Sequence, residues 1–575
     1  MISTRAAALA ALISWMGSTT APAAGPAERK ALFGELHMHT RYSFDAYAGT
    51  AMTPGDAYEF AKGKPWVQGG QTYRLTQPLD FMAVTDHAFY LGSFVRMSEE
   101  GHPYAEHPLA PTALSDDLAE RRTLFGKVLA ASRAGQGFQE LMLPEVQKET
   151  WERIVAFANE HYEPGVFTTL IGYEWTATPG GRNLHRNVIF KGDTAPVPLS
   201  RHDTERPEDL WEWMDRHRDG GHEALAIPHN SNLSDGIMFE RVDSQDRPLT
   251  AEYAEQRMRN EPLVEVTQQK GQSETHPSLS PNDEFADFWL HEYLVGSRGE
   301  QEVTEFAGGY VRDAYRTGLE LQDELGFNPY RFGLVAATDS HSGRPSVERL
   351  PPTAVRPEVY RVNANTRTLS GLTGLWAERN DRASVFEALR RRETWGTTGP
   401  RIRARLFGGF DVDGVDPKRA DWVEKAYACC VPMGTDLPAD GQSGPPSFVV
   451  WAMKDPEGAH LDRIQIVKGW SENGESAEHV YDVAGSGDRR PGADGKLPAV
   501  GTTVDLAAQT YDNSIGAAEL QGVWTDPDFD SRLNAFYYVR VLEIPTPIGP
   551  SRRGDRPETA VQERAYTSPI WYVAP

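Results

Sequence analysis

The feature that most constrains the fold is a short apolar run that ends in a histidine or a carboxylate. It first appears where His37 and His39 follow the run that starts at Ala31. Residues at positions i and i+2 of an extended chain point to the same face, so both imidazoles can reach one cation. A single His-x-His pair is weak evidence, because paired structural histidines are about as common. A metal site becomes the better interpretation because the pattern recurs along the chain.

The same pattern recurs four times between residues 79 and 341. The apolar runs end in these groups: Asp86-His87, Glu174, His229 and Asp339-Ser-His341. His185 is the exception, because it precedes its apolar run rather than following it. In parallel α/β sheets and barrels, reactive groups collect where the strands end at their carboxyl edge. The set as a whole therefore predicts an α/β fold with a metal site at that edge.

Several longer strings carry a resemblance to a known family. They are Gly34-Glu-Leu-His-Met-His-Thr40, Ser43-Phe-Asp-Ala-Tyr47, Thr53-Pro-Gly-Asp-Ala-Tyr58, Gly172-Tyr-Glu-Trp175, Ser340-His-Ser-Gly343 and Thr398-Gly-Pro-Arg401. Together they resemble the PHP (polymerase and histidinol phosphatase) superfamily of metal-dependent hydrolases and, within it, the uncharacterised DUF3604 family. The resemblance covers nearly the whole chain after residue 24. It implies a distorted (β/α)7 barrel over residues 30–400, here interrupted by helical insertions.

The resemblance also implies up to three metal ions, held by nine side chains in three groups. These groups are His37, His39, Glu174 and Asp339 for the first ion, Glu174 as a bridge with His185 and His229 for the second, and His87, His341 and Asp45 for the third. Asp45 stands where many relatives carry a histidine, which makes the third site richer in oxygen. Histidine and carboxylate ligands suit Zn, Mn or Fe ions, and we expect two or three divalent ions.

Four residues are candidates for a catalytic role. Clustered divalent ions supply hydroxide from a bound water and clamp phosphoryl oxygens, so Glu174 and Asp339 would act by holding them. Asp86 is expected to orient an imidazole rather than to bind metal. Arg401 follows a family-like Thr-Gly-Pro string and could bind a pair of phosphate oxygens. The arginines that flank His185, at positions 182 and 186, are expected on the surface.

Two insertions are expected on the loop face of the barrel. Residues 90–150 lead into a helix from Trp151 to Glu160, which has apolar residues at helical spacing. Residues 231–330 form an irregular excursion with three further candidates for the pocket: Glu265, Glu274 and His276. Insertions of this kind would shape a substrate-selective lid.

The pattern changes near Pro400. A helical segment at residues 383–391 gives way to short alternating segments at 403–407, 447–452, 461–467 and 535–542, separated by Gly, Pro, Asp and Ser. This spacing is typical of an antiparallel β-sandwich, so residues 401–575 are expected to form a sandwich-like second domain. The last apolar segment, around Ile570, would be its closing strand.

Residues 1–24 read as a signal peptide, with Arg5, an apolar segment from Ala6 to Met16 and small residues before position 25. This predicts a periplasmic or secreted protein. No other apolar segment approaches the length of a membrane span, so no integral membrane segment is expected. The only cysteines are the neighbours Cys429 and Cys430, for which two thiols are expected rather than a strained vicinal disulfide.

The predicted function is an exported, multinuclear metal-dependent hydrolase acting on a small ester, most simply a phosphoester. The net charge of -24 argues against nucleic acid as a partner. One alternative keeps the metals and cleaves amides, lactones or carboxylic esters. A phosphate would need at least one Arg or Lys over the metals, whereas those substrates would suit an apolar, aromatic pocket. The other alternative is a degenerate, non-catalytic binding module of the cell envelope. The oligomeric state is left open.

Overall fold

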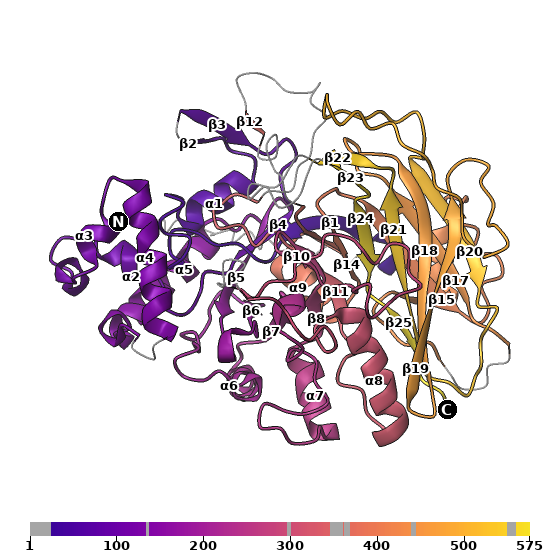
Figure 1. The fold of residues 1–575 in the computed structure, drawn as a ribbon, viewed down its shortest axis with the longest axis horizontal. Helices are drawn as coiled ribbons and strands as arrows, with labels where there is room; N and C mark the ends of the chain where they lie inside the picture. Colours follow the sequence, from indigo (N-terminus) through magenta and orange to yellow (C-terminus); the bar gives the residue numbers. More distant parts are fainter. Residues whose placement is uncertain are drawn as a thin grey trace, which may run out of the picture.

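The computed structural model describes residues 25–68, 70–133, 137–295, 301–345, 360–361, 369–438, 444–548 and 559–575. Within them, the largest sheet has 12 strands, in the order β19-β18-β21-β24-β14-β13-β1-β4-β5-β6-β7 with β25 paired to β21 (Figure 1). Its strands are β1 (Lys30–Glu35), β4 (Phe81–Val84), β5 (Thr168–Trp175), β6 (Arg186–Phe190), β7 (Ala224–Pro228), β13 (Leu372–Ala377), β14 (Thr394–Thr397), β18 (Leu461–Glu472), β19 (Glu475–Gly485), β21 (Ala535–Glu543), β24 (Arg564–Thr567) and β25 (Ile570–Tyr572). The predicted signal peptide at 1–24 lies outside the described residues.

One strand in the N-terminal half of this sheet runs against its neighbours. β1 pairs with β4 in parallel and β4 with β5 in parallel, whereas β6 is antiparallel to both β5 and β7. All residues of β4 to β7 are buried, as expected of strands covered on both faces. Because β6 is reversed, its first residue lies at the same edge as the last residues of β5 and β7. This reversal explains why His185 precedes its apolar run.

The expected closed (β/α)7 barrel is not confirmed, although the α/β class is. β8 (Leu263–Glu265) and β11 (Gly333–Val335) pair with each other in a separate parallel ladder. β8 lies beside β7 without forming a ladder with it, so the sheet is not closed within the described residues. Among the described residues, the segments that follow β1 and β11 form an isolated bridge, between Met38 and Ser340, and no ladder. Strands β8 and β11 are both three residues long.

Helices cover the N-terminal half of the sheet (Figure 1). They are α1 (Pro54–Ala61), α2 (Ser93–Arg96), α3 (Ala110–Ala113), α4 (Leu118–Arg133), α5 (Pro144–Glu160), α6 (Pro207–Asp219), α7 (Ala251–Asn260), α8 (Val311–Leu325), α9 (Arg382–Arg390) and, among the later strands, α10 (Trp422–Cys429). The helix predicted from Trp151 is α5, which starts earlier, at Pro144, where proline needs no hydrogen-bond partner. The Asp381 side chain caps α9 by accepting a 2.7 Å hydrogen bond from the Ser384 amide. None of the described helices has the length and apolar character needed to cross a membrane.

The strands after residue 400 form two antiparallel layers. One layer is the sheet β16-β15-β17-β20, made of β15 (Arg403–Gly409), β16 (Val431–Pro432), β17 (Ser447–Met453) and β20 (Glu519–Thr525). The other layer is the β19-β18-β21-β24 part of the large sheet, and the Phe448 and Tyr537 rings pack between the layers at 4.4 Å. β14 pairs with β13 on one side and β24 on the other. The strand ladder therefore continues across residue 400. The domain boundary near that residue stays a prediction.

Three smaller pairings complete the strands. They are β2 (Trp66–Gln68) with β3 (Gln71–Arg74) and β12 (Tyr360–Arg361), the hairpin β9 (Thr267–Gln268) and β10 (Gly271–Gln272), and β22 (Thr546–Ile548) with β23 (Thr559–Val561). The predicted closing strand is split at Ser568 into β24 and β25, because Pro569 cannot donate to a ladder. The expectation of two free thiols is wrong in this structure, which joins Cys429 and Cys430 at the end of α10.

A buried network of charges joins the inserted segment to β21. Arg540 donates to both oxygens of Asp283, at 2.7 and 2.8 Å, and Arg312 of α8 lies 2.8 Å from the same carboxylate. Glu274 lies between the two arginines and accepts a 2.6 Å hydrogen bond from Tyr538. All these side chains are at most 2% exposed where they pair. Glu274, a candidate for the pocket on sequence grounds, therefore has a structural role.

Candidate metal centre

The segment that follows β1 brings His37 and His39 to one side of the sheet. Met38 exchanges hydrogen bonds with Thr85, which follows β4, and its side chain is fully buried in the core. Because side chains alternate along an extended chain, the two histidines on either side of Met38 point the other way together. Their ring centroids lie 5.2 Å apart.

The next two strands deliver His87 and Glu174. These residues form an isolated parallel bridge, and the Ala88 amide donates to the Glu174 carbonyl at 3.0 Å. His185 precedes the reversed strand β6, and its Nδ1 lies 2.8 Å from Glu174 Oε1. His229 follows β7, and its Nε2 lies 3.4 Å from the same oxygen. Histidines next to β4, β6 and β7 thus face the one carboxylate carried by β5.

A residue in the left-handed conformation positions the last candidate ligands. Asp339 has φ 51° and donates its amide to the His37 carbonyl at 3.0 Å. Aspartate is one of the residues that tolerates this conformation. The resulting turn brings the carboxylate of Asp339 and the ring of His341 to the centre, with Asp339 Oδ1 lying 3.4 Å from His37, His39 and His341 nitrogens.

The side chains fall into three overlapping groups, and within each group the candidate ligand atoms lie within 4.8 Å of one another. The groups are His37, His39 and Asp339; His37, Glu174 and His229; and His39, Asp45, His87 and His341. The structure therefore brings the predicted side chains together but groups them differently from the prediction. His37 and His39 each belong to two groups. His185 belongs to none of the three and contacts Glu174 instead. Its ligand role stays a prediction.

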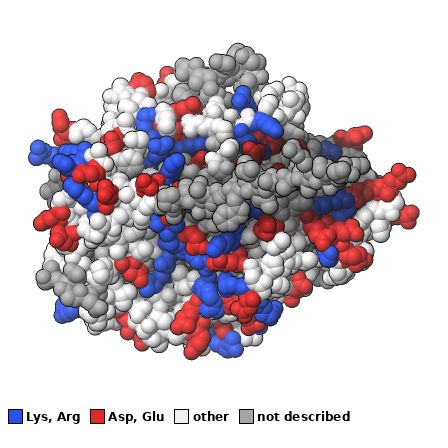
Figure 2. All heavy atoms as spheres, turned by 180° about the vertical axis from the view of Figure 1, so that it is seen from behind, with Lys and Arg blue, Asp and Glu red and all other residues white. Residues whose placement is uncertain are grey.

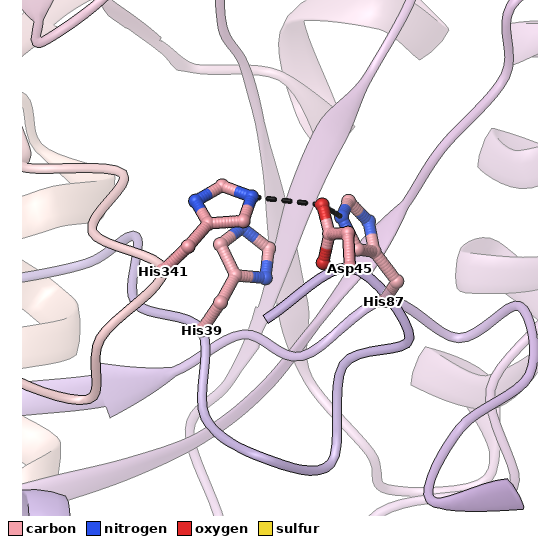
Figure 3. Close-up of side chains that lie close together, drawn as sticks. All are labelled: His39, Asp45, His87 and His341. Carbon is pink, nitrogen blue, oxygen red and sulfur yellow. Dashed lines mark hydrogen bonds and ion pairs between the residues drawn. The ribbon is translucent and has the colours of Figure 1, made fainter. Parts of the chain in front are cut away.

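The third group is held together by Asp45 (Figure 3). Asp45 Oδ2 lies 2.8 Å from His341 Nε2 and 3.1 Å from His87 Nε2, so one carboxylate oxygen sits between two imidazoles. Asp45 is in the loop after His39, whereas the two histidines follow β4 and β11. Three distant parts of the sequence meet here.

Several atoms of the centre are buried and have no hydrogen-bond partner among the described residues. They are His37 Nε2, His39 Nε2, His229 Nδ1 and Nε2, Asp339 Oδ1 and Asp45 Oδ1. Buried polar atoms nearly always have a hydrogen-bond partner, so several unpartnered atoms that point to one place indicate a site for a bound group. Nitrogen and carboxylate donors without a thiolate fit divalent Zn, Mn or Fe ions. The residues present therefore fit the metals that the sequence predicts.

A second layer orients the histidines. Glu265 Oε2 lies 2.9 Å from His37 Nδ1, Ser43 Oγ lies 2.8 Å from His39 Nδ1, and Thr176 Oγ1 lies 2.7 Å from His87 Nδ1. Each contact uses Nδ1 and leaves Nε2 for the centre, which is how proteins fix the tautomer of a ligand. Glu265, which ends β8 and was one of three further candidates for the pocket, is buried and contacts His37. His276 stacks on Phe306 at 3.9 Å and lies in none of the three groups.

Charges and burial shape the ionisation of the centre. Burial favours the neutral form of Glu174, but His87, His229 and His185 outweigh it and hold the pKa of Glu174 well below its usual value. Burial lowers the pKa of His185 to about 4, which keeps the ring neutral at pH 7. Ionised carboxylates and neutral imidazoles are the forms that bind metal ions, so a bound ion would displace the proton of His39, whose pKa burial would lower but Asp339 and Glu174 raise to about 9.

We expect the substitution Glu265→Gln to weaken metal binding by about 10- to 100-fold, because the amide no longer accepts the His37 proton as strongly. Competition with a chromophoric chelator measures this affinity. Glu212→Gln, on the exposed face of α6, is the matched control and should leave it unchanged. Equal affinities in the two variants would show that Glu265 does not support a metal ligand.

Two of the predicted catalytic residues lie elsewhere. Asp86 accepts hydrogen bonds from the Thr40 amide, at 2.6 Å, and from its hydroxyl, at 2.7 Å, so it fixes the loop after His39 rather than an imidazole. Arg401 donates to the carbonyl of Gln77, which precedes β4, whereas His87 follows it. Arg401 is thus at the opposite edge of the sheet from the centre. The sequence does not show which end of a strand Arg401 packs against, because that depends on tertiary contacts.

The arginines beside His185 do not line the centre either. Arg186, expected on the surface, is fully buried and pairs with Glu261 at 2.9 Å. Arg182 donates to the carbonyl of Pro179 in its own turn.

Sequence reasoning missed Lys270 and Gln268, which both contact Asp339 Oδ2. They lie in and next to the hairpin β9–β10, whose short strands carry no apolar alternation. The Gln-Lys-Gly turn was the available signal, since glycine beside polar residues is typical of a hairpin loop.

The mixed α/β fold and the clustered histidines and carboxylates define a candidate metal-binding protein. The chain belongs to the DUF3604 family, a family of unknown function whose model matches residues 26–574. Among solved structures, one similar chain is a two-domain protein from Bacteroides vulgatus that contains a predicted PHP-like metal-dependent phosphoesterase. It is 10% identical, with a TM-score of 0.30, over 93% of this chain and 96% of that chain. No curated protein is significantly similar.

Proposed function

We propose that this protein is a multinuclear metal-dependent hydrolase whose preferred substrates are small phosphoesters. The observation that carries the proposal is the convergence of three overlapping groups of candidate ligands, in which several nitrogen and carboxylate atoms are buried without a hydrogen-bond partner among the described residues. Bound divalent ions would lower the pKa of a coordinated water and polarise the ester oxygens. The resemblance to the PHP superfamily, read from the sequence motifs, supports the same class.

Glu174 has the geometry of a bridging ligand. Its Oε2 faces His39 at 3.1 Å and His37 at 3.4 Å, whereas its Oε1 faces His185 at 2.8 Å and His229 at 3.4 Å. Each oxygen therefore belongs to a different side of the centre. A carboxylate divided in this way can neutralise two cations at once.

Phosphoesters are favoured because three ligand groups lie close enough to act on one phosphoryl group, and because a lysine reaches the centre. One observation favours the alternative of a carboxylic ester, lactone or amide. The Phe44 ring lies 5.2 Å from the His87 ring and 4.6 Å from Phe89, so aromatic side chains adjoin the third group. A non-catalytic binding module would have no use for three groups of candidate metal ligands.

The substrate proposal concerns small molecules. On the face shown in Figure 2, acidic and basic side chains are interspersed, and the net charge is -24. A protein that binds a nucleic acid backbone usually gathers its basic residues into a patch. We also propose export, on the basis of the sequence of residues 1–24. Mass spectrometry of the protein from a fractionated host tests for the loss of that segment.

The test of the function is metal analysis followed by a substrate panel. The purified protein is reconstituted with Zn, Mn or Fe, its bound metal is measured, and it is assayed on chromogenic phosphomonoesters, phosphodiesters, carboxylic esters and anilides. We expect two or three ions per chain and turnover of a phosphoester. His37→Ala should lose both, and His479→Ala on the exposed part of β19 should lose neither. Turnover of carboxylic esters or anilides alone would favour the alternative, and a reconstituted protein without metal would contradict both.

A further inference from the structure

We propose that Lys270 binds an anionic, non-bridging oxygen of the substrate's phosphoryl group, and so selects phosphorylated over neutral esters. This inference rests on the proposed function and assigns a substrate-binding residue to it. Within the part of the chain that the structure describes, Lys270 is the only lysine or arginine that forms an ion pair with a carboxylate of the centre.

Lys270 lies where the buried ligands meet solvent. Its side chain is 30% exposed, whereas that of its partner Asp339 is 1% exposed. The two oxygens of Asp339 have different neighbours: Oδ1 faces the rings of His37, His39 and His341, and Oδ2 contacts Lys270. The ammonium group therefore stands at the accessible side of the centre, next to the atoms predicted to hold metal.

The backbone of Lys270 is held in place on both sides. The Lys270 amide donates to Gln268 Oε1, and Asn232 Nδ2 donates to the Lys270 carbonyl at 3.2 Å. Gly271 follows with φ 109°, and a Cβ there would lie 2.9 Å from Asn232 Nδ2. The hairpin thus needs a glycine at this point and fits closely against the loop after β7. A fixed backbone limits the positions that the ammonium can reach.

The charge of Lys270 distinguishes an anionic substrate from a neutral one. A phosphoryl group brings negative charge to the centre, and a hydrogen bond between charged groups is about twice as strong as one between neutral groups. A neutral carboxylic ester has no such oxygen before it reacts. A purely structural role, in which Lys270 only balances the buried Asp339, makes a different prediction: removing the lysine would then disturb the metal ligand itself.

The test compares Lys270→Met with a matched lysine. Lys191 has a similarly exposed side chain, 33%, and also pairs with carboxylates, but it follows the end of β6 opposite to His185. Isothermal titration of the metal-loaded proteins with inorganic phosphate should show about 10- to 100-fold weaker binding for Lys270→Met. Lys191→Met should bind phosphate like the parent protein, and Lys270→Arg, which keeps the charge, should recover part of the affinity.

Kinetics supply the second readout. We expect Lys270→Met to raise KM for a phosphomonoester and to leave the KM for a neutral carboxylic ester unchanged, at equal metal content. Unchanged phosphate affinity in the metal-loaded variant would overturn the inference while the parent's phosphoester turnover leaves the proposed function intact. Loss of bound metal from Lys270→Met would also overturn it, in favour of a structural ion pair. A metal-loaded parent that neither binds phosphate nor cleaves phosphoesters would overturn the proposed function first, and this inference with it.

Discussion

Replacing Glu174 with glutamine is expected to remove at least one metal ion per chain and to lower hydrolytic turnover on the order of 10³-fold or more, the scale of losing a group that stabilises charge in a dry site. Glutamine keeps the size of the side chain but removes the charge that lies within 3.4 Å of five histidine rings: His37, His39, His87, His185 and His229. Elemental analysis gives the metal content, and turnover of the best ester in the panel gives the second measurement.

Glu160→Gln, at the exposed end of α5, is the matched control for Glu174→Gln and should change neither quantity. Circular dichroism of both variants checks that they are folded. If Glu174→Gln kept its full metal content and its turnover, Glu174 would not be a bridging ligand, and the central position given to it here would be wrong.

Replacing Arg540 with methionine should lower the free energy of unfolding by about 3–5 kcal/mol. Arg540 donates to both oxygens of Asp283 and lies 3.3 Å from Glu274, and none of these side chains reaches solvent. Methionine fills part of the space but leaves buried carboxylates short of a partner. Urea-induced unfolding at a fixed metal concentration measures the change.

Arg532→Met is the control for Arg540→Met. Arg532 also pairs with a carboxylate, Asp530, at 2.5 Å, but its side chain is 80% exposed, and exposed ion pairs add little to stability because water and salt screen them. The two variants should therefore differ by several kcal/mol. Equal unfolding free energies would show that the network between the inserted segment and β21 adds little to stability.

The strand ends were predictable from the sequence because their signal is local. A buried strand needs a run of apolar residues, and a polar group directly after it is visible as a break in that run, as at His87, Glu174 and His229. The order and direction in which strands pair in the sheet have no such local signal. The reversal of β6 and the joining of β14 to β24 depend on contacts between residues far apart in the chain. For the same reason, the closed barrel was expected and an open ladder was found.

The side chains around the centre also include some that local sequence predicts and some that only distant contacts position. Residues next to strand ends were found from the sequence, whereas Asp86 and Arg401 were misplaced because their partners, Thr40 and Gln77, come from other segments. Lys270 escaped notice because it reaches Asp339 only once the hairpin β9–β10 has folded against the strand ends. The resemblance to a family predicted the candidate metal ligands, whereas the contact between Lys270 and Asp339 was visible only in the structure.

The order of strands in the large sheet has a consequence for how the protein is made. β1 pairs Lys30 with Ala377, and β14 pairs Trp395 with Thr567, so neighbouring strands are separated by hundreds of residues of synthesis. Folding slows as contacting residues lie farther apart in sequence. While the ribosome is still adding the middle of the chain, one edge of β1 has no partner. We therefore expect the nascent chain to expose a strand edge for most of its synthesis and to depend on chaperones during that time.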